Sequence, residues 1–370
     1  MMERVGEMGY SLTMKKVMVG MSGGIDSSVA AYLLKKAGYE VEGVTMLIWK
    51  KDSNLKPSSS ASSCYNPKEE EELYETKEIC SKLGIVHHTV DLKDLYETTV
   101  LKNFKSEYLN GRTPNPCIWC NTLIKFGAMV ESSRALFDFD YFATGHYARI
   151  EKGENGRMQL LKAVDGKKDQ SYFLSRLTQN QLSTTIFPLG AMTKDEVRKI
   201  DVELGLHREG MDESQDFYGG DYTDLLNVQD RKGKIILADS GKCLGFHNGF
   251  WHYTIGQRKG LGVAYSEPLY VIALDSRRNE VIVGTEKATR ETTLLALNPN
   301  WVGEEDFEEG KIYKAKIRST SRGEDCRAFR TPDGFSLEFI SPVKAATPGQ
   351  SAVVYDGDRV ICSGVIERAE

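Results

Sequence analysis

Short apolar runs alternate with segments of helical spacing in the first 150 residues of the chain. Residues 16–20 form a β-branched run, a Gly/Ser turn follows, and residues 27–37 have the apolar spacing of a helix that ends at Gly38. The other elements predicted here are strands at 41–48, 85–90 and 141–144 and a helix at 69–83. Strands that alternate with helices predict a doubly wound α/β domain with a parallel sheet.

The hydrophobic pattern changes in two places. Residues 53–67 are rich in Ser, Asn and Pro and lack periodicity, so we expect a long surface loop. Beyond residue 293, short alternating runs separated by Gly and Asp replace the helical spacing, which predicts a small all-β, barrel-like domain. We therefore expect a disordered leader at 1–13, an α/β domain at 14–210, a central domain at 211–290 and a β-barrel domain at 291–370.

The composition narrows the class of protein. Hydrophobic residues make up 40% of the 370 residues, and no stretch approaches the roughly 18 apolar residues of a membrane helix. Residues 1–13 lack the apolar core of a signal peptide. Seven cysteines without a secretory signal favour reduced thiols, so we expect a cytoplasmic protein. The net charge of −5 restricts any nucleic-acid site to a local basic patch.

The turn between the first strand and the first helix has the sequence GMSGGIDSS, residues 20–28. Backbone N–H groups and the helix dipole bind phosphate at such a turn, whereas the alternative is an ordinary Gly/Ser turn. The motif is neither a Walker A loop nor a dinucleotide loop. It resembles the SGGxDS loop of the PP-loop ATP pyrophosphatases, which cleave ATP to AMP and pyrophosphate and pass AMP to a substrate oxygen. This resemblance implies ATP and Mg²⁺ as cofactors, with Asp26 near the metal and the pyrophosphate.

A second motif places two thiols in one stiff turn. Cys117 and Cys120 form a Cys-x-x-Cys pair that follows two prolines in the segment GRTPNPCIWCN, residues 111–121. Such a pair can bind one metal or form a redox couple, so zinc, redox and iron–sulfur roles all remain open.

Further motifs extend the resemblance over nearly the whole chain. In order along residues 16–366, they are GRTPNPCIWCNTLIKFG, ATGHYAR, KKDQSYFL, FPLG, HYTIGQRKGLG and TPGQ. This series resembles the tRNA-specific 2-thiouridylases. The resemblance implies a transferase of sulfur-containing groups that adenylates and thiolates C2 of wobble uridine 34 in the tRNAs for Lys, Glu and Gln. It also implies a tRNA-binding role for the central domain, and a cysteine desulfurase or sulfur-relay protein as the sulfur donor.

The resemblance implies roles for individual residues. The ATP site would consist of Gly20, Met21, Ser22, Gly23, Gly24, Ile25, Asp26, Ser27, Met46 and Gly145. The residues facing the target base or the tRNA would be Asn115, Pro116, Cys117, Lys168, Asp169, Gln170, Arg318 and Gln350. The catalytic residues would be Cys120 as the nucleophile, together with Cys117, Asp26 and His146. A core role for His146 and plain surface roles for Lys168 and Gln350 are the structural alternatives.

The chain departs from the family pattern where sulfur is transferred. The family has an aspartate in place of Cys117 and a second catalytic cysteine in place of Tyr218, and its Arg-Tyr dipeptide appears here as Arg318-Ser319. Two mechanisms follow. Either Cys117 and Cys120 carry and resolve a persulfide, or they hold a [4Fe–4S] cluster with Cys64 as the third thiolate. Rival functions are another adenylating RNA-modification reaction and tRNA binding without sulfur transfer.

Overall fold

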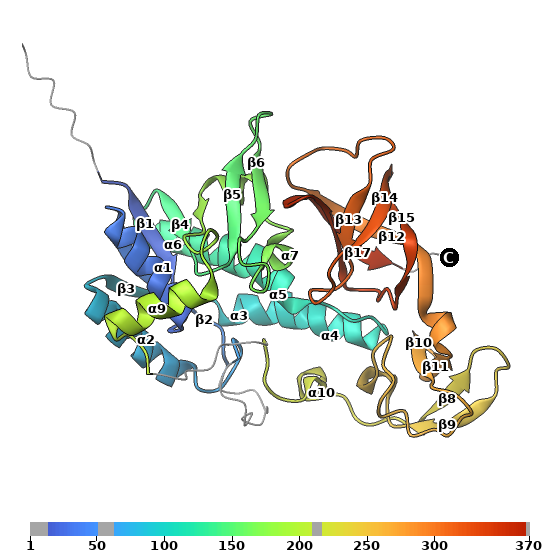
Figure 1. Ribbon diagram of the computed structural model, residues 1–370. Helices are drawn as coiled ribbons and strands as arrows, with labels where there is room; N and C mark the ends of the chain where they lie inside the picture. The colour runs from blue at the N-terminus through green and yellow to red at the C-terminus, as the bar shows by residue number, and fades with distance from the viewer. Residues whose placement is uncertain (1–13, 51–62, 209–216, 368–370) are drawn as a thin grey trace, which may run out of the picture.

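The structure is a computed structural model that describes residues 14–50, 63–208 and 217–367 (Figure 1). The expected leader at 1–13 and most of the expected surface loop at 53–67 lie outside these residues. No helix in the described segments is long and apolar enough to cross a membrane.

The N-terminal part is built on a five-stranded parallel sheet in the order β3-β2-β1-β4-β7. Its strands are β1 (Lys16–Gly20), β2 (Glu40–Leu47), β3 (Val86–Asp91), β4 (Tyr141–Ala143) and β7 (Thr185–Ile186). Alternate residues of β1 enter different cores, because successive side chains of a strand point to opposite faces. Val17 and Val19 pack with α1 (Ile25–Lys36) and α2 (Glu69–Leu83), whereas Met18 belongs to the core on the other face. The prediction of a doubly wound parallel sheet is therefore confirmed.

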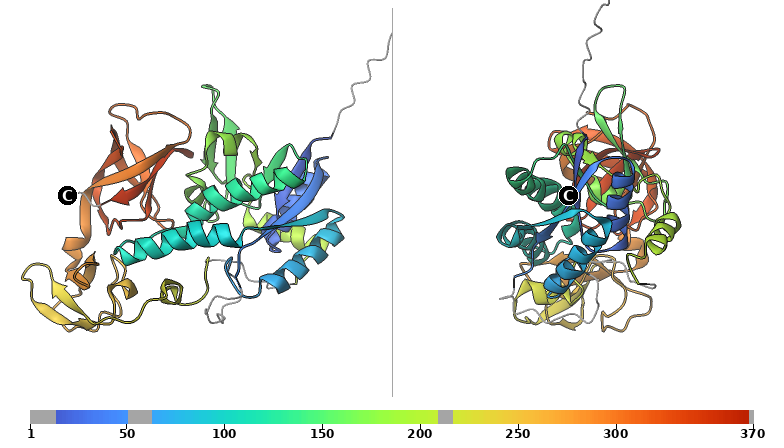
Figure 2. Two further views of the ribbon diagram at one scale, coloured as in Figure 1. Left: turned by 180° about the vertical axis from the view of Figure 1, so that it is seen from behind. Right: turned by 90° about the vertical axis from the view of Figure 1, so that its left-hand side faces the viewer.

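Helical segments that the sequence reading did not predict lie between β3 and β4. They are α3 (Lys93–Tyr96), the π-helix η1 (Glu97–Leu101), α4 (Lys102–Leu109), α5 (Pro116–Trp119), the π-helix η2 (Cys120–Ala128) and α6 (Met129–Leu136). Figure 2 shows α3 to α4 as one long rod that runs from the parallel sheet towards the C-terminal strands. The rod stops at Asn110 and Gly111, where Gly111 has a positive φ of 73°. The segment that carries the Cys-x-x-Cys turn begins directly after this stop.

The remaining sheets lie at the other end of the molecule (Figure 1). The central sheet has the order β10-β11-β8-β9 and consists of β8 (Gly233–Leu237), β9 (Cys243–His247), β10 (Tyr270–Asp275) and β11 (Glu280–Gly284). The C-terminal strands are β12 (Arg290–Trp301), β13 (Tyr313–Lys316), β14 (Glu324–Thr331), β15 (Gly334–Lys344), β16 (Ser351–Asp356) and β17 (Arg359–Glu367). They are antiparallel, and β12 also pairs with β17. This closure confirms the predicted barrel.

The C-terminal sheet also includes two strands from the N-terminal half of the chain. The hairpin of β5 (Ala148–Lys152) and β6 (Met158–Lys162) joins it where Leu161 pairs with Arg359. The other helices of the described residues are α7 (Ser171–Leu174), α8 (Gln179–Ser183), α9 (Lys194–Leu204), α10 (Tyr222–Leu226) and the 3₁₀ turns η3 (Phe250–His252) and η4 (Glu286–Thr289). The hairpin thus ties the barrel to the α/β part.

Candidate functional site

The phosphate-loop candidate lies between β1 and α1. Gly23 has a φ of 74°, and a Cβ there would lie 2.5 Å from the Thr76 hydroxyl, so only glycine fits. The hydroxyls of Ser22 and Ser27 lie 3.2 Å apart, and the Ser27 hydroxyl donates to the Gly24 carbonyl. Gly24 is the N-cap of α1, and no side chain of the described residues caps this end. The first N–H groups of α1 therefore remain available to an anion.

The other expected ATP residues come from neighbouring strand ends. Met46 lies two residues beyond Val44, which pairs with Gly20 at the end of β1. Gly145 follows β4, and a Cβ there would be 2.6 Å from the carbonyl carbon of Asp26. Ligands of doubly wound sheets bind outside such carboxyl ends of strands, so the fold brings the expected nucleotide residues together. Within this set, the side chain of Met21 is buried in the core, and its backbone N–H and carbonyl bond to Val44 and Thr45 of β2.

Asp26 has two side-chain partners that the sequence reading missed. Its Oδ1 accepts hydrogen bonds from the Tyr147 hydroxyl at 2.8 Å and from the Lys194 ammonium at 2.7 Å. Both partners lie far from Asp26 along the chain, so no local sequence pattern indicated that they contact it.

The thiol pair lies at the start of two helices. Asn115 caps α5, since its Oδ1 accepts from the backbone N–H of Ile118, and the buried Ile118 side chain anchors the turn in the core. Cys117 and Cys120 are both half-buried, and Cys120 is the first residue of η2. Burial raises the pKa of the Cys120 thiol to about 11, an effect that the Lys125 ammonium opposes.

Lys125 connects the thiol to the nucleotide side of the site. Its ammonium acts electrostatically on Cys120 and also on His146, the residue after Gly145. Burial, with Lys125 as the second cause, lowers the pKa of His146 well below its ordinary value, so its imidazole is neutral. The His146 Nδ1 lies 2.7 Å from the Thr144 hydroxyl, and the ring packs against Phe126.

Cys64 lies beside the segment that contains Tyr218. The backbone N–H of Tyr65 donates to the Phe217 carbonyl at 2.8 Å, and the Tyr65 ring stacks on Tyr96. The pKa of Tyr96 is also affected by the thiols. Burial raises its pKa well above the ordinary value, and the thiols of Cys120, Cys64 and Cys117 add to this shift. All three thiols thus act electrostatically on the Tyr96 hydroxyl, but no three His, Cys, Asp or Glu side chains of the described residues are arranged to hold a metal ion.

A buried tyrosine, Tyr218, stands where the family pattern has its second catalytic cysteine. The Tyr218 side chain is 3% exposed, and its hydroxyl has no hydrogen-bond partner among the described residues. A buried phenol in this place cannot replace a thiol in sulfur transfer.

The residues expected to contact tRNA are held by protein contacts. Asp169 accepts from the backbone of Ala163 and Ser171, and its carboxylate is 3.6 Å from the Lys316 ammonium of the barrel. The Gln170 side chain accepts from the Tyr147 N–H. Lys168 is half-buried.

Two of them join the barrel to the rest of the chain. The Arg318 guanidinium donates to the Ala345 carbonyl of the barrel at 2.6 Å and to the Ile255 carbonyl of the central part at 3.5 Å. The Gln350 amide donates to the carbonyls of Thr113 and Pro114, which precede the thiol turn. The Gln350 side chain thus crosses from the barrel to the segment before the thiol turn.

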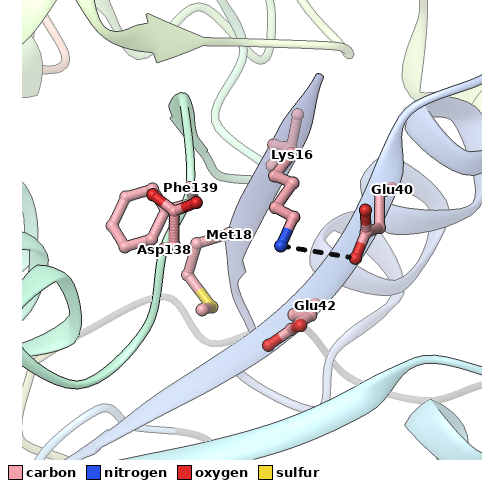
Figure 3. A pocket seen from close by; sticks show the side chains of 7 residues that line it. Lys16, Met18, Glu40, Glu42, Asp138 and Phe139 are labelled. Atoms are coloured by element: carbon pink, nitrogen blue, oxygen red, sulfur yellow. Dashed lines mark ion pairs between the residues drawn. The ribbon is translucent and has the colours of Figure 1, made fainter. Parts of the chain in front are cut away.

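A shallow hollow elsewhere on the sheet does not belong to this site. Figure 3 shows it at the amino ends of β1 and β2, where Lys16 and Glu40 form an ion pair of 3.8 Å. The phosphate-loop candidate lies at the opposite ends of these strands, so we assign the hollow no role.

Comparison with known proteins covers all three parts of the chain. Residues 15–218 match the tRNA methyl transferase HUP domain, 225–285 the tRNA methyl transferase PRC-barrel domain and 291–366 the aminomethyltransferase beta-barrel domain. The tRNA-specific 2-thiouridylase MnmA of Endomicrobium trichonymphae is 44% identical over 361 residues, which is 96% of this chain and 99% of the relative. The chain belongs to the tRNA-specific 2-thiouridylase family.

Other members of the tRNA-specific 2-thiouridylase family match equally broadly. MnmA 1 of Caldanaerobacter subterraneus subsp. tengcongensis is 44% identical over 95% of this chain and 98% of its own length. MnmA of Picosynechococcus is 42% identical over 96% of this chain and 99% of its own length. The resemblance inferred from the motifs is therefore confirmed at the level of the family.

Proposed function

We propose that the protein is an ATP-dependent tRNA-uridine 2-sulfurtransferase that converts wobble uridine 34 of the tRNAs for Lys, Glu and Gln to 2-thiouridine. Family membership supports the reaction. The observation that carries the proposal is the bridge between its two halves: Gly145 touches the phosphate loop, and the adjacent His146 packs against Phe126 of η2, the helix that begins at Cys120. A nucleotide on the loop and a sulfur on Cys120 would thus lie on either side of His146.

The reaction follows from the poor leaving ability of a carbonyl oxygen. O2 of the uridine attacks the α-phosphorus of ATP, and pyrophosphate leaves. Sulfur then attacks C2, and the former O2 departs as part of AMP. The loop N–H groups and the Ser22 hydroxyl would hold the phosphates, and Ser27 would keep the loop in shape through its bonds to Ser22 and Gly24. Asp26 is the carboxylate that would hold Mg²⁺, and the metal would neutralise charge on the pyrophosphate.

For the sulfur step, we propose that Cys120 carries a persulfide and Cys117 resolves it. The terminal sulfur attacks C2, and AMP leaves. The Cys117 thiolate then attacks the Cys120 sulfur, which releases 2-thiouridine and leaves a Cys117–Cys120 disulfide. A small-molecule or protein thiol must reduce this disulfide before the next turnover. A cysteine desulfurase or sulfur-relay protein would supply the persulfide sulfur.

A [4Fe–4S] cluster on Cys64, Cys117 and Cys120 is the alternative, and it is motivated by the Cys-x-x-Cys turn and the third thiol at Cys64. Such a cluster would offer an open iron to hydrosulfide. The donor set suits iron–sulfur chemistry, but the described side chains do not form a metal-holding arrangement. We therefore derive no step through a cluster.

The proposal also covers tRNA binding and location. The central domain at 211–290 would bind tRNA, between a catalytic domain at 14–210 and the barrel at 291–370, and the protein would work in the cytoplasm. Asn115, Pro116 and Cys117 would face the target base, because they lie in the capped turn that presents Cys120. Lys168, Asp169, Gln170, Arg318 and Gln350 would support the tRNA surface.

The decisive experiment is nucleoside analysis of tRNA after incubation with the protein, ATP, Mg²⁺ and a sulfide or persulfide donor. We expect 2-thiouridine and equal amounts of AMP and pyrophosphate, and Asp26→Ala should give none of them. A different modified nucleoside would support another adenylating RNA enzyme. tRNA binding without any modification would support a binding protein.

Cysteine variants separate the two sulfur mechanisms. Under the persulfide mechanism, Cys117→Ala and Cys120→Ala lose thiolation, whereas Cys64→Ala keeps it and anaerobically prepared protein holds no iron. Under the cluster mechanism, all three variants lose iron and activity together. Cys243→Ala is the matched control, since Cys243 is exposed in the central sheet.

A further inference from the structure

Lys194 is a buried lysine at the start of α9. Only 5% of the residue is exposed. Thr193 caps the helix in a capping box with Glu196, and the Lys194 backbone N–H donates to the Asp165 carboxylate at 3.0 Å. These bonds fix the backbone from which the Lys194 side chain extends. A lysine is rarely buried unless a charge faces it.

The partner of Lys194 is the carboxylate of the phosphate loop. Its Nζ lies 2.7 Å from Oδ1 of Asp26, the oxygen that also accepts from the Tyr147 hydroxyl. The Lys194 side chain is 6% exposed and that of Asp26 is 32% exposed, so the carboxylate faces the open side of the pair. An anion or metal that enters the loop would meet Asp26 first and Lys194 directly behind it.

The segment around α9 is held to the loop at a second point. His207, three residues beyond the helix, donates from Nε2 to the Gly23 carbonyl at 2.9 Å, and its Nδ1 lies 2.6 Å from the Asp201 carboxylate. Figure 1 shows α9 beside α1. The distance between Lys194 and the loop is therefore set at both ends of α9.

The loop itself contains no cation. Its nine residues, GMSGGIDSS, lack the lysine that a Walker A loop supplies to the phosphates. Pyrophosphate nevertheless leaves with several negative charges, which fixed cations stabilise. Lys194 is the ammonium that the structure holds against this loop.

We propose that Lys194 binds the pyrophosphate part of ATP and that it pairs with Asp26 when no nucleotide is bound. This inference rests on the proposed function, because it takes the loop as the ATP site. With ATP bound, Asp26 would be free to hold the metal, and the Lys194 ammonium would donate to a phosphate oxygen. Lys194 thus keeps a counter-charge in both states, which avoids an unpaired buried ammonium.

The test is a double-mutant cycle read by calorimetric binding of inorganic pyrophosphate in EDTA, without metal. Asp26→Asn should strengthen binding on the order of 10-fold, because it releases Lys194 for the phosphate. Lys194→Met should weaken binding by at least about 10-fold, and the double variant should lose the gain of Asp26→Asn. Lys199→Met, on the exposed face of the same helix, should bind like wild type.

The outcomes separate this inference from the proposed function. If Asp26→Asn strengthens pyrophosphate binding equally in wild type and in the Lys194→Met variant, the gain reflects only removal of a negative charge, and the inference is overturned. If wild type binds pyrophosphate and Lys194→Met binds it with the same affinity, the inference is overturned as well, but the loop remains the ATP site. A wild type that binds neither pyrophosphate nor ATP would overturn both. If Lys194→Met does not fold, Lys194→Gln, which can still donate to Asp26, takes its place.

Discussion

Gly145→Ala should disable the nucleotide site through a single methyl group. The added Cβ would lie 2.6 Å from the carbonyl carbon of Asp26 and 2.7 Å from the Ser27 nitrogen. Non-bonded carbon atoms approach to about 3.5 Å, so the start of α1 must move by roughly 0.9 Å. Both atoms are backbone, so no side-chain rotation can relieve the contact.

Gly145→Ala should lower both the folding stability and the reaction rate. Overpacking of this kind costs about 1–3 kcal/mol of folding free energy. A displacement of about 1 Å at a reacting centre can cost on the order of 100-fold in rate. We therefore expect weaker ATP binding and a 2-thiouridine rate about 100-fold lower, with a modest loss of thermal stability.

The assay measures calorimetric ATP affinity, thiolation rate and melting temperature on the same preparations. Gly166→Ala is the matched control, because a Cβ at Gly166 has no atom within 4 Å and Gly166 has no positive φ. It should match wild type in all three measurements. If Gly145→Ala binds ATP and thiolates tRNA at the wild-type rate, the end of β4 is not part of the nucleotide site.

Three further changes test other parts of the account. Tyr218→Phe removes a buried hydroxyl without a partner among the described residues, so activity should persist and stability should stay equal or rise by about 1 kcal/mol in urea unfolding; a large loss of activity would give the phenol a catalytic role. Gln350→Ala removes the bonds to Thr113 and Pro114 and should lower thiolation about 10-fold while ATP affinity is unchanged; equal losses in both would place its effect elsewhere. Burial lowers the pKa of His87 to about 4, so the unfolded chain binds more protons than the folded one between pH 6.5 and 4. The free energy of unfolding should therefore decrease by at most about 3 kcal/mol as the pH is lowered from 6.5 to 4. His87→Gln should flatten this dependence, and unaltered pH curves would refute it.

The elements that the sequence predicted are those set by local patterns. The strands β1 and β4 are short, largely buried apolar runs, and the helical spacing of residues 69–83 corresponds to α2, which Gly84 ends with a positive φ of 62°. The hairpin of β5 and β6 escaped prediction as part of the barrel sheet, since its partner strand lies some 200 residues later. Local periodicity carries no information about such a pairing.

The candidate site shows the same division. The phosphate loop is contiguous, so its motif could be read directly, and Cys64, within the expected loop at 53–67, was named as a third thiolate. The contacts of Asp26 could not be predicted, because Tyr147 and Lys194 are 121 and 168 positions away. The bond between Tyr65 and Phe217, which sets Cys64 beside Tyr218, is equally non-local.

Adenylation of the carbonyl oxygen is the central claim, and an oxygen label follows that atom directly. A tRNA that carries ¹⁸O at O2 of uridine 34 is incubated with the protein, ATP, Mg²⁺ and a sulfur donor, and the AMP is analysed by mass spectrometry. The account predicts one AMP molecule carrying one ¹⁸O atom for every 2-thiouridine formed, since O2 leaves as a phosphate oxygen of AMP. Unlabelled AMP accompanied by 2-thiouridine would show that O2 leaves by another route and would contradict the account.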